Sequence, residues 1–321
     1  MHQKRCVVSH PLIRFSRRLL SKSPSSAPVG LSLCGGGFLG AFHIGAWQGL
    51  SEHFPNWAAS GPAIAGSSAG SVVGASICSH MCKDQMLESL GRISEKVRSF
   101  PLKALTPGAD LAGIMAQELR RSLPEDAHER CSGRLFIGVT TFPDKKKWPP
   151  RFRLINDFRS REHLIECVRI SSYLPGVTAP LTALPRLDGV AAIDGGFSRN
   201  WPRLPLPGAS EEYRNKAKGY HTLYVSAFSG PDFPIAPLPP STSGSSFDIS
   251  LSAQNVRLTA HTGLLEQLHD IIMPPDDSKL NKLIKGGSDA VGRFAAPENR
   301  PPPEIRSLLE LRDNELSSTR V

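Results

Sequence analysis

Short apolar runs that end in glycine alternate with helical patterns along the first part of the chain. Residues 29–34 are predicted to form a buried strand that ends at three glycines, and residues 62–65 a second strand that ends at the sequence GSSAG. A helix is predicted after each turn, over residues 41–52 and 69–81. Strand, turn and helix therefore occur twice, which indicates an α/β layer with parallel strands.

The rest of the chain continues this mixture of elements. Further strands are predicted over residues 135–141, 152–156, 190–193 and 223–228. Further helices are predicted over residues 86–100, 111–122 and 162–171. We therefore expect one α/β domain over residues 29–230, with a mostly parallel central sheet flanked by helices.

The segments on either side of this domain differ from it in composition. Residues 231–295 are expected to form a loop rich in proline and serine and then a helical extension packed on the domain, and residues 296–321 a tail. Residues 1–28 are rich in arginine and serine, and the first acidic residue is Glu52. This basic leader fits a transit peptide, an amphipathic segment on a membrane surface, or a disordered leader without a targeting role.

Charge and hydropathy exclude two classes of function. The formal net charge is +9, but six basic residues lie in the leader, which leaves +3 for the remainder. Since the basic residues are not interleaved with aromatic ones, nucleic acid is not an expected partner. No apolar run approaches the ~18 residues of a membrane span. The six cysteines are dispersed and are expected to be buried thiols in a reducing compartment.

The turn after the second strand has the spacing of a nucleophilic serine. In the sequence Gly66-Ser67-Ser68-Ala69-Gly70, Ser68 would sit on a sharp strand-to-helix turn with its hydroxyl exposed. Gly66 and Gly70 would allow the turn to approach its surroundings closely. A serine hydroxyl in this position needs only a neighbouring base to become a nucleophile.

The glycine loop after the first strand allows two interpretations. Residues 35–40 (GGGFLG) also match the G-x-G-x-x-G pattern of dinucleotide-binding folds, which calls for an acidic residue about 20 positions later. Residues 55–65 contain no acidic residue, and the serine turn follows instead. We therefore interpret Gly35, Gly36 and Gly37 as donors of backbone N–H groups to an oxyanion.

The base could be an aspartate or a histidine. Asp194 follows an apolar strand in the sequence Asp194-Gly195-Gly196, which would place its carboxylate at the edge of the sheet near the other loops. A histidine after this aspartate would give the Ser, Asp, His order of α/β-hydrolases. The candidates are His221, His261 and His269.

The three motifs, in this order, resemble the patatin-like phospholipase family, and especially its branch of adipose triglyceride lipase and adiponutrin. The sequences CGGGFLGAFHIGAW and NDFRSREHLIECVRISSYLPG are similar to its oxyanion loop and to the segment before its aspartate. The sequence IDGGFSRNWP is similar to the turn of that aspartate. The resemblance covers residues 30–205 and, more faintly, later segments.

This resemblance implies a patatin-like three-layer fold and a Ser68–Asp194 dyad that cleaves lipid esters through an acyl-enzyme. Gly40, Gly66, Gly70, Gly195 and Gly196 would be supporting glycines of the motifs. Neither a cofactor nor a metal is implied. Leu39 stands where many patatins have Arg or Lys, which favours a neutral acylglycerol over a charged headgroup.

The expected partner is a lipid, either an acylglycerol or a phospholipid, at a peripheral membrane or lipid-droplet surface. The expected location is intracellular: in the cytoplasm, on a membrane or droplet, or in an organelle if the leader is a transit peptide. The alternative function is a catalytically silent lipid-binding or regulatory protein of the same fold.

Overall fold

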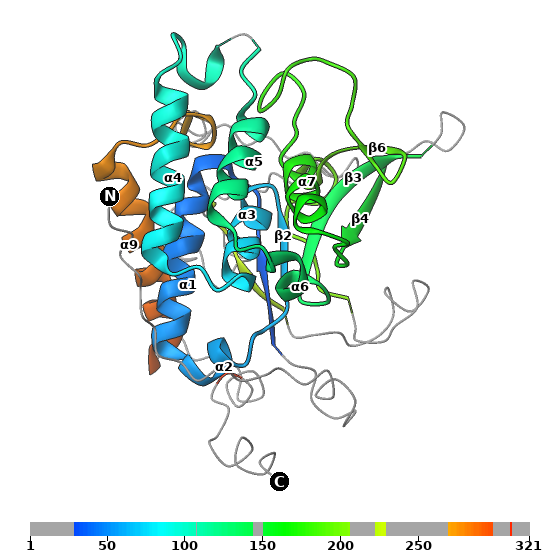
Figure 1. Cartoon of the computed structure of the whole chain (residues 1–321). Coiled ribbons are helices and arrows are strands. Elements are labelled where there is room, and N and C mark those ends of the chain that lie inside the picture. Colours follow the sequence, from blue (N-terminus) through cyan, green and yellow to red (C-terminus); the bar gives the residue numbers. More distant parts are fainter. Residues whose placement is uncertain are drawn as a thin grey trace.

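A seven-stranded sheet lies at the centre of the molecule (Figure 1). The computed structural model describes residues 29–106, 108–143, 150–205, 222–228 and 269–297, together with Leu309. The strand order is β5-β6-β3-β2-β1-β7, and β4 pairs with β3 beside this path. The strands are β1 (Gly30–Leu33), β2 (Ile64–Ser67), β3 (Leu135–Phe142), β4 (Arg151–Ile155), β5 (Arg186–Leu187), β6 (Val190–Asp194) and β7 (Thr222–Val225).

Four neighbouring strands, β7, β1, β2 and β3, are parallel. Leu33 at the end of β1 lies opposite Gly66 of β2, so the glycine loop and the serine turn leave the sheet at the same edge. The strands β4, β5 and β6 are antiparallel to their neighbours, which the sequence pattern did not reveal. The expected α/β fold with a mostly parallel central sheet is confirmed.

Helices flank this sheet (Figure 1). The longer ones are α1 (Ala41–His53), α3 (Ala69–Cys78), α4 (Lys83–Arg98), α5 (Leu111–Ser122), α7 (Arg161–Ser171) and α9 (Asp277–Ala295). The short ones are α2 (Pro55–Ala59) and α6 (Ala127–Cys131). Helix α9 packs directly on α1, because Gly45 and Gly287 let the two backbones approach closely. Helix α9 lies within residues 231–295, where the sequence predicts a helical extension.

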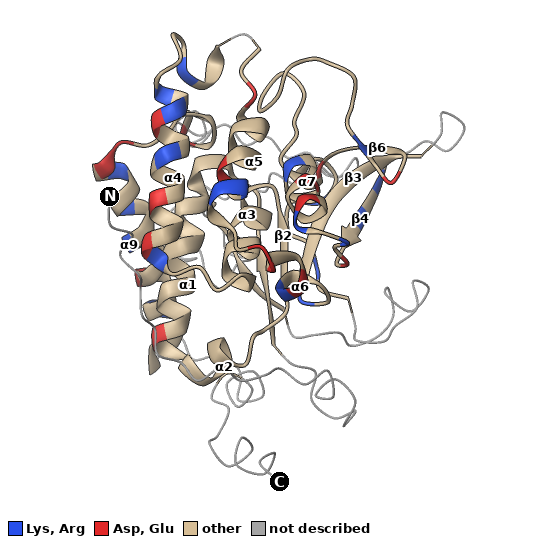
Figure 2. Ribbon diagram, viewed as in Figure 1, with Lys and Arg blue, Asp and Glu red and all other residues tan. Residues whose placement is uncertain are grey.

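Of the elements on either side of the glycine loop and the serine turn, only α1 contains charged residues. Figure 2 shows the basic and acidic residues on the outer helices and on strands such as β4, whereas β1, β2 and α3 contain none. Leu31, Leu33 and Ile64 on these strands are completely or almost completely buried. The glycine loop and the serine turn are therefore carried by strongly apolar elements. Among the described residues, no helix is long and apolar enough to cross a bilayer.

Most predicted elements are present with ends shifted by a few residues. Helix α3 stops at Cys78 instead of residue 81, because His80 adopts a left-handed backbone with φ of 61°. The short elements α2, α6 and β5 were not predicted. The leader over residues 1–28 and most of the tail lie outside the described residues, as do residues 231–268 of the predicted loop and helical extension.

Candidate active site

Ser68 occupies a strained turn between β2 and α3. Its φ of 51° and ψ of −125° are rarely adopted by a residue with a side chain, and each such residue costs about 1–3 kcal/mol. The flanking glycines make the turn possible. A Cβ on Gly66 would overlap the Gly70 carbonyl, and one on Gly70 would overlap the Leu33 carbonyl of β1. The predicted strand-to-helix serine turn is therefore present.

The backbone of Ser68 is fixed by Ser171, the last residue of α7. The N–H of Ser68 donates to Ser171 Oγ at 2.9 Å, and the Ser171 hydroxyl donates to the Gly138 carbonyl at 2.7 Å. Ser171 is completely buried. This chain of hydrogen bonds uses the Ser68 N–H and connects the serine turn to β3.

Asp194 ends β6 and is held by three hydrogen bonds through its backbone and side chain. Its N–H donates to the Tyr173 carbonyl at 3.0 Å, and its carbonyl accepts from Thr140 Oγ1 at 2.7 Å. Its carboxylate accepts from the N–H of Gly196 at 2.6 Å. The backbone of the turn therefore fixes the direction of the carboxylate.

The Ser68 side chain lies beside the Asp194 carboxylate, close enough to lower its pKa. Burial of this carboxyl raises its pKa from 3.8 to about 6, and the hydrogen bond from Gly196 and the interaction with Ser68 only partly offset the effect. A carboxylate with a pKa near 6 is a stronger base than an exposed one and is still ionised at neutral pH. The structure therefore places Ser68 beside a buried carboxylate that is ionised at neutral pH.

The sheet brings these residues together across β3. Ser67, which precedes Ser68, lies opposite Gly138, and Asp194 lies opposite Val139 on the other side of the same strand. A Cβ on Gly138 would come within 2.5 Å of Ser67 Oγ, and one on Gly195 would overlap the Gly138 carbonyl. The lack of a side chain at Gly138 therefore leaves space for Ser67, and the lack of one at Gly195 lets the Asp194 turn approach the Gly138 backbone.

In the glycine loop, one of the three backbone N–H groups expected to bind an oxyanion already donates a hydrogen bond within the protein. The N–H of Gly35 donates to Asn200 Oδ1 at 2.9 Å, which removes Gly35 from the expected oxyanion donors. Gly36 and Gly37 lead into the 3₁₀ helix η2 (Gly37–Gly40), and no described residue accepts a hydrogen bond from either N–H. Two of the three predicted donors are thus available. Gly40 lets the glycine loop pack closely against the serine turn, since a Cβ on Gly40 would lie 3.1 Å from Ala69 Cβ.

The structure also places two other residues named from the sequence. Leu39 is 3% exposed and packs in the hydrophobic core, and the preference for a neutral acylglycerol stays a prediction. His269 is largely exposed and contacts Asp270. His221 and His261 lie outside the described residues.

A histidine that was not among the three candidate bases lies beside the glycine loop. His43 of α1 is completely buried, and its Nε2 hydrogen-bonds to the Cys34 carbonyl at 2.9 Å. Burial lowers the pKa of His43 to about 4, so the ring is neutral and Nε2 is the donor in this contact. His43 therefore anchors the residue before Gly35.

Ser68 opens into an apolar cavity of about 140 Å³. Helix α3 forms its floor with Val72 and Val73, and α4 and α5 form its walls with residues such as Leu90 and Met115. Gly37 and Ile271 lie at its rim on the side of the glycine loop. This lining suits a hydrocarbon chain attached to an ester carbonyl at Ser68.

Sequence reasoning missed three residues of this site. Asn200 and Ser171 were inside segments that resemble the family, but nothing in their local pattern indicates partners 165 and 103 positions away. Gly138 interrupts a strand of apolar and β-branched residues, and an isolated glycine in a strand is a recognised sign of close backbone approach. That signal could have identified Gly138.

A serine on a strained turn, a buried carboxylate in contact with it and an adjoining apolar cavity are typical of the class of lipid ester hydrolases. A family model described as patatin-like phospholipase matches residues 31–207. The chain therefore belongs to the patatin-like phospholipase family, as the motifs indicated.

Three human proteins show the range of its relatives. The chain is 31% identical to 1-acylglycerol-3-phosphate O-acyltransferase PNPLA3 of Homo sapiens, over 89% of this chain and 55% of the relative. It is 29% identical to the human patatin-like phospholipase domain-containing protein 2, over 87% of this chain and 51% of that protein. It is 28% identical to the human patatin-like phospholipase domain-containing protein 4, over 84% of this chain and 98% of that protein. The chain thus spans about half the length of the first two relatives.

Proposed function

We propose that this protein is a serine lipid acyl hydrolase that uses Ser68 and Asp194 as a catalytic dyad. The observation that carries the proposal is the placement of Ser68, on a strained strand-to-helix turn, beside the buried carboxylate of Asp194. Membership of the patatin-like phospholipase family supports a lipid ester as the substrate.

The first half of the reaction forms an acyl-enzyme. Asp194 takes the proton of the Ser68 hydroxyl while the oxygen attacks the ester carbonyl carbon. The N–H groups of Gly36 and Gly37 stabilise the negative charge on the former carbonyl oxygen. As the tetrahedral intermediate collapses, Asp194 returns the proton to the leaving alcohol.

The second half releases the acyl group. Water enters, gives a proton to Asp194 and attacks the acyl carbon, and the proton then passes to Ser68 as the fatty acid leaves. The side chains of Asn200 and Ser171 take no part in these transfers. They keep the glycine loop and the serine turn in position by their hydrogen bonds to Gly35 and Ser68.

The substrate we propose is an acylglycerol or a phospholipid presented at a lipid surface. The cavity beside Ser68 is lined mainly by apolar residues, and exposed leucines lie in the two segments adjacent in sequence to the lining residues Leu111 and Thr178. The side chains of Leu102 and Leu181 in these segments are 60% and 83% exposed. Exposed leucines around an apolar site support docking on a membrane or a lipid droplet.

One relative suggests a second fate for the acyl-enzyme. The human PNPLA3 relative is named as an acyltransferase with 1-acylglycerol-3-phosphate as acceptor. The same acyl-Ser68 intermediate could pass its acyl group to such an alcohol instead of water. Transfer would need the same nucleophile and base, so the proposed dyad serves both reactions.

A substrate panel tests the proposal. Purified wild type, Ser68→Ala and the control Ser99→Ala, which changes an exposed serine at the end of α4, are incubated with triacylglycerol, diacylglycerol, phospholipid and lysophospholipid. Adding 1-acylglycerol-3-phosphate reveals acyl transfer. We expect fatty acid release or transfer by wild type and Ser99→Ala only. Activity that survives in Ser68→Ala contradicts the dyad, and a folded wild type without activity supports the silent alternative.

A further inference from the structure

A polar cluster lines the cavity far from Ser68. It consists of Ser76 of α3, Ser89 of α4, and Glu118 and Ser122 of α5, and the apolar Met86 and Leu119 line the cavity beside it. The segment of α3 from Ala69 to Ser76 covers about 10 Å at the helical rise per residue. The cluster, which we call the distal cluster, therefore lies about two helical turns away from the nucleophile.

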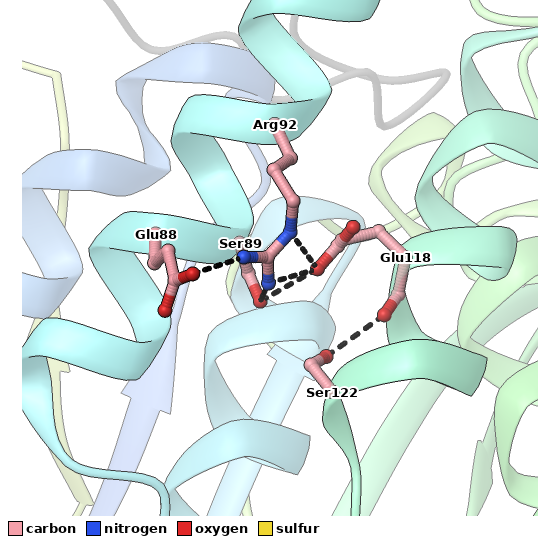
Figure 3. A network of polar contacts seen from close by, with 5 residues as sticks. All are labelled: Glu88, Ser89, Arg92, Glu118 and Ser122. Atoms are coloured by element: carbon pink, nitrogen blue, oxygen red, sulfur yellow. Dashed lines mark hydrogen bonds and ion pairs between the residues drawn. The ribbon is translucent and has the colours of Figure 1, made fainter. Parts of the chain in front are cut away.

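A partly buried ion pair between Arg92 and Glu118 dominates the distal cluster (Figure 3). Glu118 Oε1 accepts hydrogen bonds from Arg92 Nε at 2.9 Å, from Arg92 Nη2 at 2.6 Å and from Ser89 Oγ at 3.0 Å. The Glu118 side chain is 9% exposed, whereas Arg92 reaches outward to a second carboxylate on Glu88. The pair closes the cavity between α4 and α5.

The hydroxyl donors of the distal cluster are already used within the protein. Ser76 Oγ donates to the Val72 carbonyl at 3.0 Å, and Ser122 Oγ donates to the Glu118 carbonyl at 2.9 Å. The Ser89 hydroxyl is used on Glu118. Acceptor capacity remains on the serine oxygens and on Glu118 Oε2, to which no described residue donates, and these four residues line the cavity.

An acceptor-rich end does not suit the methyl terminus of a plain acyl chain. Such a terminus would keep water from a carboxylate oxygen without giving it a hydrogen bond, which is costly in a buried site. A group that donates one hydrogen bond removes this cost. A hydroxyl on the acyl chain is the simplest donor that an otherwise apolar chain can bring to this position.

We propose that the distal cluster recognises a hydroxyl group near the far end of the acyl chain, so that the protein prefers hydroxylated acyl esters. This inference rests on the proposed acyl hydrolysis at Ser68. Glu118 is the specificity-determining residue, since its Oε2 accepts the hydrogen bond from the chain, and Arg92 holds that carboxylate in place.

The test compares matched substrates. Monoacylglycerols with octanoyl, decanoyl, dodecanoyl and tetradecanoyl chains are prepared with and without a terminal hydroxyl. We expect kcat/KM of wild type to favour the hydroxylated form about tenfold for at least one chain length, mainly through KM, as one hydrogen bond to a charged group supports.

Variants separate recognition from folding. The double variant Arg92→Met with Glu118→Met removes both charges together and avoids an unpaired buried one. It should lose the preference or reverse it. Glu118→Gln keeps the shape of the side chain and should lower the preference at least threefold, which provides the test if the double variant does not fold. The control, Arg120→Met with Glu162→Met, removes an exposed ion pair outside the cavity and should keep the preference.

Two different failures are distinguishable. If Ser68→Ala still hydrolyses these esters, the proposed function is wrong. If hydrolysis depends on Ser68 but no hydroxylated ester is preferred at any chain length, or the preference survives in the double variant and in Glu118→Gln, the proposed role of the distal cluster is wrong. In that case the cluster only closes the cavity.

Discussion

Asn200 Oδ1 accepts a hydrogen bond from the N–H of Gly35 at 2.9 Å, and Asn200 Nδ2 donates to the Gly35 carbonyl at 3.4 Å. Asn200 belongs to the turn that follows Asp194, whereas Gly35 begins the glycine loop after β1. One buried amide therefore links the segment that carries the base to the segment that carries the oxyanion donors.

Removal of this link should slow catalysis more than binding. In Asn200→Ala the Gly35 N–H and carbonyl lose their partners, which costs about 1–3 kcal/mol and loosens the loop. We expect kcat to fall by about tenfold to a hundredfold with little change in KM. Steady-state kinetics measure both, with Asn281→Ala on the exposed face of α9 as the control. An unchanged kcat would mean that the loop is held by other contacts.

The pH dependence of activity should report the ionisation of Asp194. Burial raises the pKa of this carboxyl to about 6, and only the ionised form can take the Ser68 proton. The value of kcat/KM should therefore be constant near pH 8 and fall tenfold per pH unit well below pH 6. A profile that stays flat to pH 4.5, within the range where the protein is folded, would exclude Asp194 as the base.

The raised pKa of Asp194 also implies that the stability of the folded protein depends on pH. The folded state holds the proton of Asp194 more tightly than the unfolded chain, so the contribution of this group to stability is present below pH 3.8 and is lost as the pH rises through about 6. The buried charge then costs about 3 kcal/mol at neutral pH. Asp194→Asn should raise the Tm at pH 8 by about 5 °C or more while abolishing activity.

A pH series provides the control for this experiment. The difference in Tm between Asp194→Asn and wild type should shrink toward zero between pH 8 and pH 4, because wild-type Asp194 becomes neutral in that range. A lower Tm for the variant at pH 8 would show that the ionised carboxylate is stabilised by its surroundings.

Docking on lipid should depend on the exposed leucines near the cavity. In Leu102→Asp with Leu181→Asp, two side chains that are 60% and 83% exposed become charged without disturbing the core. We expect weaker flotation with neutral lipid vesicles and a several-fold higher KM for emulsified triacylglycerol. Hydrolysis of a water-soluble butyrate ester should not change. Asn281→Asp on α9 is the matched control, and equal loss with the soluble ester would point to misfolding instead.

Local sequence patterns predicted the parts of the site that depend on local geometry. The serine turn needs Gly66 and Gly70 beside Ser68, and the Asp194 turn needs the two glycines that follow, so both are visible as short motifs. The strand and helix content followed from apolar periodicity in the same way. The family resemblance then supplied the roles.

Contacts between distant segments could not be predicted in this way. The N–H of Gly35 donates to Asn200 and so cannot bind an oxyanion, yet the two residues are 165 positions apart in the sequence. The antiparallel pairing of β6 with β3, which places Asp194 opposite Val139, is a property of the chain path and leaves no periodic signal. The distal cluster also arises only when α4 and α5 pack side by side.

Covalent trapping of Ser68 tests the central claim most directly. Folded wild type, Ser68→Ala and Asp194→Asn are treated with a fluorophosphonate that carries an alkyl chain, and the modified peptide is identified by mass spectrometry. We predict one adduct on Ser68 in wild type, none in Ser68→Ala, and labelling at least a hundredfold slower in Asp194→Asn. An adduct on another residue, or a Ser68 adduct that forms equally fast in Asp194→Asn, would contradict the proposed dyad.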